Sequence, residues 1–190
     1  MLSSLFKTYA AVKSFTDGPK TTVCDTVEPL TEPFDAAAYM GTWYEIQHSA
    51  GAPFQPDSFD CTTALYSDLD PETASFTVYN SSTVGPSPRF GVTGTASCAD
   101  TPNGQCIVSF FGQVFDEPNY LVMDTDYETY SMVYACEPNS IAFLWILSRT
   151  PTLDQATLDS LNAQAMERLP NYDWNIATTD RQGGRCKYDD

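Results

Sequence analysis

The chain is poor in basic residues and has a single histidine. Its 190 residues hold 9 lysines and arginines against 25 aspartates and glutamates, which gives a formal net charge of −16. The resulting field repels phosphate backbones and anionic membrane surfaces, so nucleic acid is not an expected partner. A Ser-His-Asp or Cys-His catalytic site would have to use His48, and its position at the end of a predicted strand favours an exposed residue or one at the mouth of the fold.

Long apolar runs and metal-binding spacings are also missing. No stretch approaches the roughly 18 apolar residues of a membrane-spanning helix. Lys7 and Lys13 interrupt the opening "MLSSLFKTYAAVKSF", so it does not form the apolar core of a secretory leader, and a leader before or overlapping residue 1 stays open. No Cys-x-x-Cys pair, zinc-type spacing or glycine-rich phosphate loop occurs. We therefore expect no metal site, no catalytic cofactor and no enzyme activity.

Hydrophobic residues, by contrast, are abundant enough for a core. They make up 42% of the chain, and the length fits one domain. Residues 1–33 mix lysine, serine, threonine and proline with little periodicity, which predicts a partly mobile N-terminal arm anchored near Cys24, with the folded domain spanning 34–190. The six cysteines are spread along the chain and predict disulfides, hence an oxidising compartment and a secreted protein, while their pairing stays open.

Short segments rich in valine, tyrosine, phenylalanine and threonine recur between residues 41 and 149. The connections between them are too short for crossover helices, so neighbouring segments are expected to pair as hairpins. Eight such strands close into an antiparallel up-and-down barrel with room for one small ligand, which makes the fold class all-β. The predicted strands are Gly41–His48, Cys61–Ser67, Ser75–Asn80, Phe90–Ser97, Cys106–Phe111, Tyr120–Asp124, Tyr130–Cys136 and Phe143–Ser148.

One amphipathic helix is predicted after the last strand, in "TPTLDQATLDSLNAQAMERL". Thr152 with Gln155 three residues later has the pattern of a capping box, and Pro170 predicts the end of the helix. A single apolar stripe indicates that the helix packs on the outside of the sheet. The stripe consists of Leu158, Leu161, Ala165 and Leu169.

Three separated motifs resemble the signature regions of the lipocalins, in the same order and with the same spacing. They are Gly41-Thr42-Trp43 in the first strand, Thr125-Asp126-Tyr127 in the turn between the sixth and seventh strands, and Arg149 after the eighth. The segments "YETYSMVYAC" and "FLWILSRTPTL" resemble the subgroup that includes apolipoprotein D, insecticyanin and crustacyanin. The resemblance covers about residues 24–186, and it implies an eight-stranded barrel with one external helix.

The resemblance also implies which residues hold the barrel together. It pairs Cys24 with Cys136 and Cys61 with Cys186; Cys98 and Cys106 then remain, and they flank the turn "ADTPNG", where a local bridge is plausible. At the closed end, Gly41 lets the chain turn into the first strand and Trp43 plugs the barrel beneath Arg149, in a cation–π contact. The expected residues of this barrel base are Gly41, Trp43, Thr125, Asp126 and Arg149.

A carrier of a small hydrophobic molecule is the function that the resemblance implies. The expected ligand is a non-covalent pigment, either a carotenoid or a linear tetrapyrrole such as biliverdin; a colourless lipid, sterol or retinoid is the alternative, and an interaction protein with a filled barrel is the alternative of another class. A homo-oligomer stays open, and Asn80-Ser81-Ser82 is a glycosylation sequon. The predicted ligand-binding residues are Phe54, Phe59, Ala64, Tyr66, Val92, Val108, Phe110, Tyr120, Val122, Val133, Phe143 and Trp145.

Overall fold

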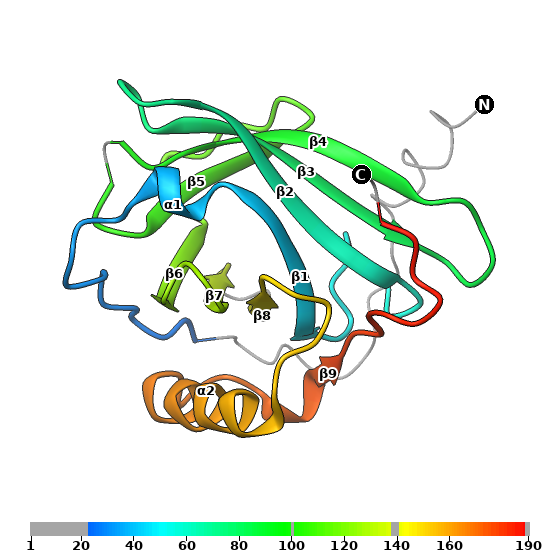
Figure 1. Ribbon diagram of the computed structural model, residues 1–190. Coiled ribbons are helices and arrows are strands. Elements are labelled where there is room, and N and C mark those ends of the chain that lie inside the picture. The colour runs from blue at the N-terminus through cyan, green and yellow to red at the C-terminus, as the bar shows by residue number, and fades with distance from the viewer. Residues whose placement is uncertain (1–22, 100, 138–140, 189–190) are drawn as a thin grey trace.

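The protein forms a closed antiparallel barrel with one long helix on its outside (Figure 1). The computed structural model describes residues 23–99, 101–137 and 141–188. Each strand pairs with the next, and β1 closes the barrel on β8, which confirms the predicted all-β class and topology. The barrel strands are β1 (Gly41–Ser49), β2 (Asp60–Asp70), β3 (Ser75–Thr83), β4 (Phe90–Ser97), β5 (Gln105–Phe110), β6 (Tyr120–Thr125), β7 (Tyr130–Cys136) and β8 (Ala142–Ser148).

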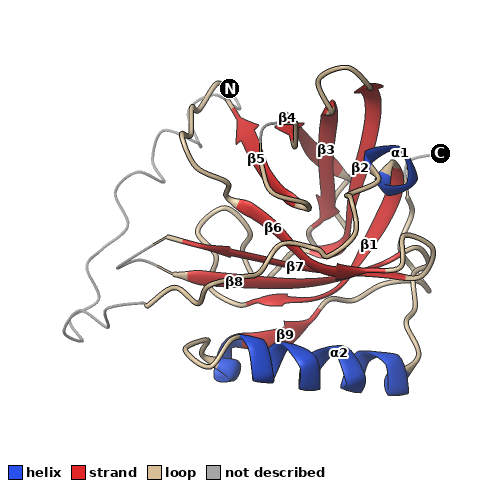
Figure 2. Cartoon of the chain, turned by 90° about the vertical axis from the view of Figure 1, so that its left-hand side faces the viewer, coloured by secondary structure: helices blue, strands red, loops and turns tan. Residues whose placement is uncertain are grey.

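The helix α2 (Gln155–Arg168) covers the outer face of the sheet beside β7, β8 and β1 (Figure 2). Its buried side chains are those of the predicted stripe, and they contact outward-facing residues such as Leu144 and Ile146 of β8. This buried apolar layer is separate from the core inside the barrel. None of the helices in the described ranges is long and apolar enough to span a membrane.

The predicted cap of α2 is wrong. The residue before the helix is Asp154, whose carboxylate accepts a hydrogen bond from the backbone N–H of Thr157 at 3.0 Å. Thr152 lies outside the helix, and its carbonyl accepts a bond from the Thr150 hydroxyl at 2.6 Å. A carboxylate in this position satisfies a free N–H of the first turn, as the expected threonine would have done two residues earlier.

Three short elements were not predicted from the sequence. The helix α1 (Ala36–Tyr39) is capped by Asp35 and leads into the closed end of the barrel. The 3₁₀ helix η3 (Trp174–Ile176) precedes β9 (Ala177–Thr179), which pairs with the end of β1.

The C-terminal chain fills a gap in the barrel wall. β2 pairs with β1 only along Gly41–Tyr44, and β9 takes over beside Gln47–Ser49. On its other side this segment reaches β2, since the N–H of Cys61 donates to the carbonyl of Arg181 at 2.8 Å. We call residues 177–182 the C-terminal seam, because they join the two strands where their own pairing ends.

The disulfides are Cys24–Cys136, Cys61–Cys186 and Cys98–Cys106, as predicted, and no cysteine in the described residues is free. The first of them holds the N-terminal segment against the barrel. Within that segment the N–H of Leu30 donates to the carbonyl of Asn103 at 3.0 Å, and Gln105 Nε2 donates to the carbonyl of Val27 at 2.9 Å. Residues 1–22 of the predicted mobile arm lie outside the described residues.

Candidate functional site

The closed end of the barrel is built around Trp43. Its indole is fully buried, and its N–H donates to the carbonyl of Tyr39 at 3.0 Å. The guanidinium of Arg149 lies 3.7 Å from the centre of the Trp43 ring, in a cation–π contact. The backbone favours glycine at position 41, because its φ of +94° belongs to the left-handed region. These contacts form a structural floor.

The turn between β6 and β7 completes the floor. The carboxylate of Asp126 accepts hydrogen bonds from the backbone N–H groups of Glu128, Thr129 and Tyr130, at 2.7–3.1 Å. Burial raises the pKa of Asp126, but these donors outweigh it and the pKa is lowered. The hydroxyl of Thr125 donates to the carbonyl of Tyr130 at 2.7 Å, which fixes the turn from its other side. Neither side chain is placed for acid–base chemistry.

Three tyrosines form a polar layer beside the floor, where Tyr66 lies opposite Gly41. The hydroxyl of Tyr120 lies 3.1 Å from that of Tyr39 and 2.8 Å from that of Tyr66, and Tyr39 also reaches the Ser131 hydroxyl at 2.7 Å. Burial raises the pKa of Tyr39 to about 12 and raises that of Tyr66 and Tyr120 as well. All three hydroxyls therefore stay protonated and share hydrogen bonds. We call Tyr39, Tyr66 and Tyr120 the tyrosine layer.

The inner wall next to Trp43 can be followed from the strand register. Trp43 lies opposite Ala64, Ala64 opposite Asn80, and Asn80 opposite Val92, so all four side chains share the inner face. Trp43 is fully buried at the floor, whereas Ala64, Asn80 and Val92 retain accessible surface. In this row of neighbouring strands, burial is thus complete only at Trp43.

A glycine makes room for an aromatic ring on the same wall. Gly94 of β4 lies opposite Phe110 of β5, and a side chain added at Gly94 would approach the Phe110 ring to 2.6 Å. The ring therefore lies across the glycine, and Phe110 is only half-buried. Asn119 closes the neighbouring gap, since its carboxamide bonds both the N–H and the carbonyl of Val108.

Aromatic side chains line the open end. Phe143 and Trp145 of β8 stack at 5.6 Å, and Phe54, from the loop after β1, lies 5.0 Å from Phe143. Phe59 contacts Phe90 at 5.0 Å. The same loop turns its buried Gln55 toward the interior, where Gln55 accepts a hydrogen bond from the Trp145 indole at 3.2 Å and donates one to Glu45.

A polar cluster lies in the wall next to Gln55. β1 has a bulge between Glu45 and Gln47, so that Glu45 lies opposite Leu147 and His48 opposite Trp145. Leu147 and Trp145 are two residues apart and share a face, so the bulge turns both Glu45 and His48 to the same side. Asp180 of the C-terminal seam completes the cluster and accepts a hydrogen bond from the Thr62 N–H at 3.1 Å.

His48 corrects a sequence-based expectation. It is not exposed but 3% accessible, because the bulge and the C-terminal seam enclose it. Burial disfavours its charged form, but the neighbouring carboxylates, Glu45 foremost, outweigh this and raise the pKa of His48. Burial and the charge of Glu45 raise the pKa of Asp180 to about 7. We call Glu45, His48 and Asp180 the wall cluster.

A family model described as a lipocalin-like domain matches residues 34–179. The chain is a lipocalin. Apolipoprotein D of Mus musculus is 31% identical to it over 138 residues, covering 70% of this chain and 70% of that protein. The outer membrane lipoprotein Blc of Vibrio cholerae is 30% identical over 154 residues, covering 76% and 81% of the two chains. These findings confirm the resemblance inferred from the motifs.

Solved structures share the fold of this lipocalin at low identity. Insecticyanin of Manduca sexta superposes with a TM-score of 0.68 at 23% identity, covering 86% of this chain and 88% of that one. H1 crustacyanin of Homarus americanus gives 0.70 at 17% identity, covering 92% and 96%. At these identities the likeness establishes the barrel and its external helix.

The predicted ligand-binding residues of this lipocalin divide into three groups. Tyr66, Val122 and Val133 belong to the packed interior, and Val122 and Val133 have no accessible surface. Phe54, Phe59 and Phe143 lie at the mouth. The remaining six inner residues are half-buried and lie along one interior surface: Ala64, Val92, Val108, Phe110, Tyr120 and Trp145.

Asn80 was predicted to be a glycosylation site, but it lies on the inner wall of the barrel. It faces the inner wall from the middle of β3, and its carboxamide oxygen is buried with no hydrogen-bond partner among the described residues. A glycan has no room on an inner wall, so this position argues against the expected attachment. Glu45, Gln55 and Asp180 were also missed, since only the bulge, the loop and the seam bring them inside.

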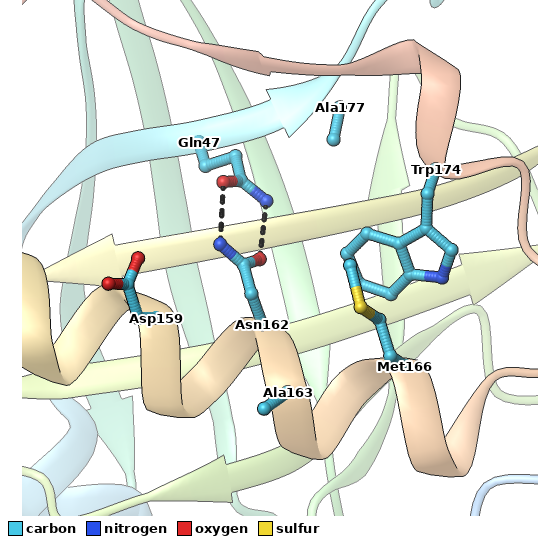
Figure 3. A pocket seen from close by; sticks show the side chains of 7 residues that line it. All are labelled: Gln47, Asp159, Asn162, Ala163, Met166, Trp174 and Ala177. Carbon is cyan, nitrogen blue, oxygen red and sulfur yellow. Dashed lines mark hydrogen bonds between the residues drawn. The ribbon is translucent and has the colours of Figure 1, made fainter.

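The hollow shown in Figure 3 lies outside the barrel, between α2 and the C-terminal chain. It is a shallow groove of about 400 Å³. Gln47 and Asn162 cross its floor and exchange two carboxamide hydrogen bonds, at 2.9 and 3.1 Å. It is lined by Gln47, Asp159, Asn162, Ala163, Met166, Trp174 and Ala177. The groove is thus separate from the barrel interior.

Proposed function

We propose that this lipocalin is a carrier that binds one small hydrophobic molecule in the upper half of its barrel. One observation supports the proposal above all: the inner residues Ala64, Val92, Val108, Phe110 and Trp145 keep accessible surface, whereas Trp43 at the floor has none. Ala64, Val92 and Phe110 supply an apolar wall of this kind. A largely apolar site with a few placed polar groups is typical of small-molecule pockets.

The few basic residues of the barrel favour a ligand whose buried part is neutral. Arg89 and Arg149 are the bases between residues 34 and 149. Arg149 is bound at the floor, and Arg89 donates to the carbonyl of Cys61 and to Ser81. An anionic group inside the barrel would therefore lack a counter-ion from these strands.

The narrower proposal is that the ligand is a pigment, either a carotenoid or a linear tetrapyrrole such as biliverdin, whose two propionates would stay in solvent at the mouth of the barrel. Phe54, Phe143 and Trp145 offer stacked aromatic faces at the mouth, which suit an extended conjugated molecule. A colourless lipid, sterol or retinoid meets the same apolar wall without this stacking.

We further propose that the protein works outside the cell or in another oxidising compartment. Three disulfides and no free cysteine in the described residues support this, since such bridges persist where thiols are not kept reduced.

Ligand titration against a pair of matched variants tests the proposal. Biliverdin, an oxygenated carotenoid and retinol would each be added to the purified protein while tryptophan fluorescence and visible absorbance are recorded. Val92→Trp adds bulk to the inner wall and is expected to weaken binding at least about ten-fold, because overpacking the site forces the ligand out. Thr93→Trp places the same side chain on the exposed outer face of β4 and is expected to leave binding unchanged.

The outcomes separate the alternatives. Binding of retinol alone would replace the pigment with a colourless ligand. Equal binding by the Val92→Trp and wild-type proteins would contradict a barrel site. No binding of any probe, together with no extractable ligand in the natural protein, would favour an interaction protein whose barrel is filled by its own side chains.

A further inference from the structure

The wall cluster brings three metal-ligand side chains to one point. Glu45, His48 and Asp180 each offer one oxygen or nitrogen atom, and these atoms all lie within 4.8 Å of one another. The three residues are 5%, 3% and 7% accessible. On a regular strand Glu45 and His48 would face opposite sides, so the bulge in β1 is what creates the grouping. The linear spacing gave no sign of it, and the sequence therefore predicted no metal site.

The imidazole of His48 has unused bonding capacity. Its Nε2 atom is buried and has no hydrogen-bond partner within the described part of the chain, and Nδ1 faces only Glu45. Nδ1 lies 2.9 Å from Glu45 Oε1, an ion-pair distance, but without the alignment of a hydrogen bond. Buried polar atoms are nearly always bonded, and each exception calls for an explanation such as an ion or water.

The charges around His48 are unbalanced. Glu45 and Asp180 are two buried carboxylates facing one imidazole, and Asp57 of the neighbouring loop adds a further negative charge in its vicinity. The nearby cation Arg181 points outward, where it pairs with Asp60. Two neutral groups partly compensate the charge of Asp180. The backbone N–H of Thr62 and Nε2 of Gln182 both donate to Asp180 Oδ2 at 3.1 Å. A cation bound between the two carboxylates would compensate their charge in place of a proton.

We propose that Glu45, His48 and Asp180 bind one divalent metal ion of the zinc class. An imidazole with two carboxylates suits such an ion, whereas calcium and magnesium prefer all-oxygen sites with more ligands. Tetrahedral coordination at about 2.0–2.1 Å places ligand atoms about 3.3 Å apart, so the side chains need to close by no more than about 1.5 Å. Three protein ligands leave a fourth position for water.

The position of the site gives the ion a structural consequence. Glu45 and His48 belong to β1, and Asp180 belongs to the C-terminal seam that fills the wall beside it. A shared ion would tie the seam to the barrel from the inside, while the Cys61–Cys186 disulfide ties it from beyond residue 182. Because Gln55 bonds both Glu45 and Trp145, the ion would also lie next to the proposed ligand space.

Metal titration of the full-length protein tests the proposal. After treatment with a chelator and its removal, Zn²⁺ and Mg²⁺ would be added separately, with calorimetry and thermal unfolding as readouts. We expect one zinc ion per chain and a higher Tm with zinc, because an ion that binds only the folded state stabilises it. Magnesium is expected to give neither effect. Co²⁺ would report nitrogen coordination through its visible spectrum.

Three variants localise the ion. Asp180→Asn and His48→Gln each remove one ligand and are expected to weaken zinc binding at least about ten-fold, a loss that even supporting residues of metal sites can cause. Asp57→Asn removes a nearby exposed charge but no ligand, and is expected to bind zinc like the wild-type protein. Circular dichroism checks the fold of each variant.

Several results would overturn the proposal. These are no zinc binding by the wild-type protein, equal loss of affinity in Asp57→Asn and Asp180→Asn, or a Co²⁺ spectrum of the hydrated ion. If Asp180→Asn or His48→Gln does not fold, the Co²⁺ spectrum of the wild-type protein tests the proposal by itself. None of these readouts depends on a molecule in the barrel, so the carrier proposal is tested separately.

Discussion

At the scale of single residues, Arg149 shows how one side chain closes a barrel. Its guanidinium donates to the carbonyls of Tyr127, Thr42 and Ala38 at 2.9, 3.2 and 2.7 Å and covers Trp43. We predict that Arg149→Ala lowers the free energy of unfolding by about 3 kcal/mol, because three carbonyls lose a charged donor and the cation–π contact disappears. Urea denaturation measures this loss.

Arg149→Lys is the matched variant, since it keeps the charge but not the planar fork of donors. Its loss of stability is expected to fall between those of the wild-type and alanine proteins. Ligand affinity of the folded variants is expected to stay unchanged, because none of these contacts of Arg149 involves a predicted ligand-binding residue. A ligand affinity that falls in parallel with stability would contradict this separation of floor and site.

At the scale of elements, helix α2 begins after an aspartate that accepts hydrogen bonds from the first turn of the helix. Asp154 accepts bonds from both the N–H and the hydroxyl of Thr157, at 3.0 and 2.5 Å. We predict that Asp154→Ala lowers the free energy of unfolding by about 1 kcal/mol, the usual cost of removing an N-cap. Thr152→Ala is the control, expected within about 0.5 kcal/mol of the wild-type protein. Guanidinium denaturation of both proteins gives the comparison, and the opposite order of effects would restore Thr152 as the cap.

Most strands could be predicted from the sequence, whereas the residue that caps helix α2 could not. Strand segments alternate in hydrophobicity and end at turn residues, so β4 and β7 were predicted with the bounds they have. The pattern around Thr152 and Gln155 fits a capping box, yet Asp154 is a competing carboxylate that the pattern does not rank. Local patterns therefore predict the presence of an element better than its first residue.

The alternation of side chains along a strand explains which residues of the site could be predicted from the sequence and which could not. The resemblance to lipocalins put Ala64 and Val92 on the inner wall, and the strand register agrees. The bulge in β1 resets the alternation after Glu45, and nothing in "GTWYEIQHS" marks it. Asp180 reaches the wall only through the pairing of β9 with β1, a contact between segments more than a hundred residues apart. The interior wall was thus predictable, and the wall cluster was not.

At the scale of the whole molecule, the C-terminal seam joins the end of the chain to the first two strands of the barrel. The disulfide Cys61–Cys186 spans 125 residues and holds the chain that follows the seam, whereas Cys98–Cys106 spans 8 residues within one hairpin. Constraining a long loop removes more conformational freedom from the unfolded chain than constraining a short one. The two bridges therefore stabilise the fold to different extents.

We predict that replacing Cys61 and Cys186 together by serine lowers the free energy of unfolding by up to about 5 kcal/mol, and replacing Cys98 and Cys106 together by about 2.5 kcal/mol. The barrel is expected to remain folded in the first variant, because the hydrogen bonds of β9 with β1 and of Arg181 with Cys61 do not need the bridge. Urea denaturation of the two double variants measures the difference. An equal loss would mean that the bridges act through native contacts rather than through loop length, and the seam would then be held mainly by its hydrogen bonds and the wall cluster.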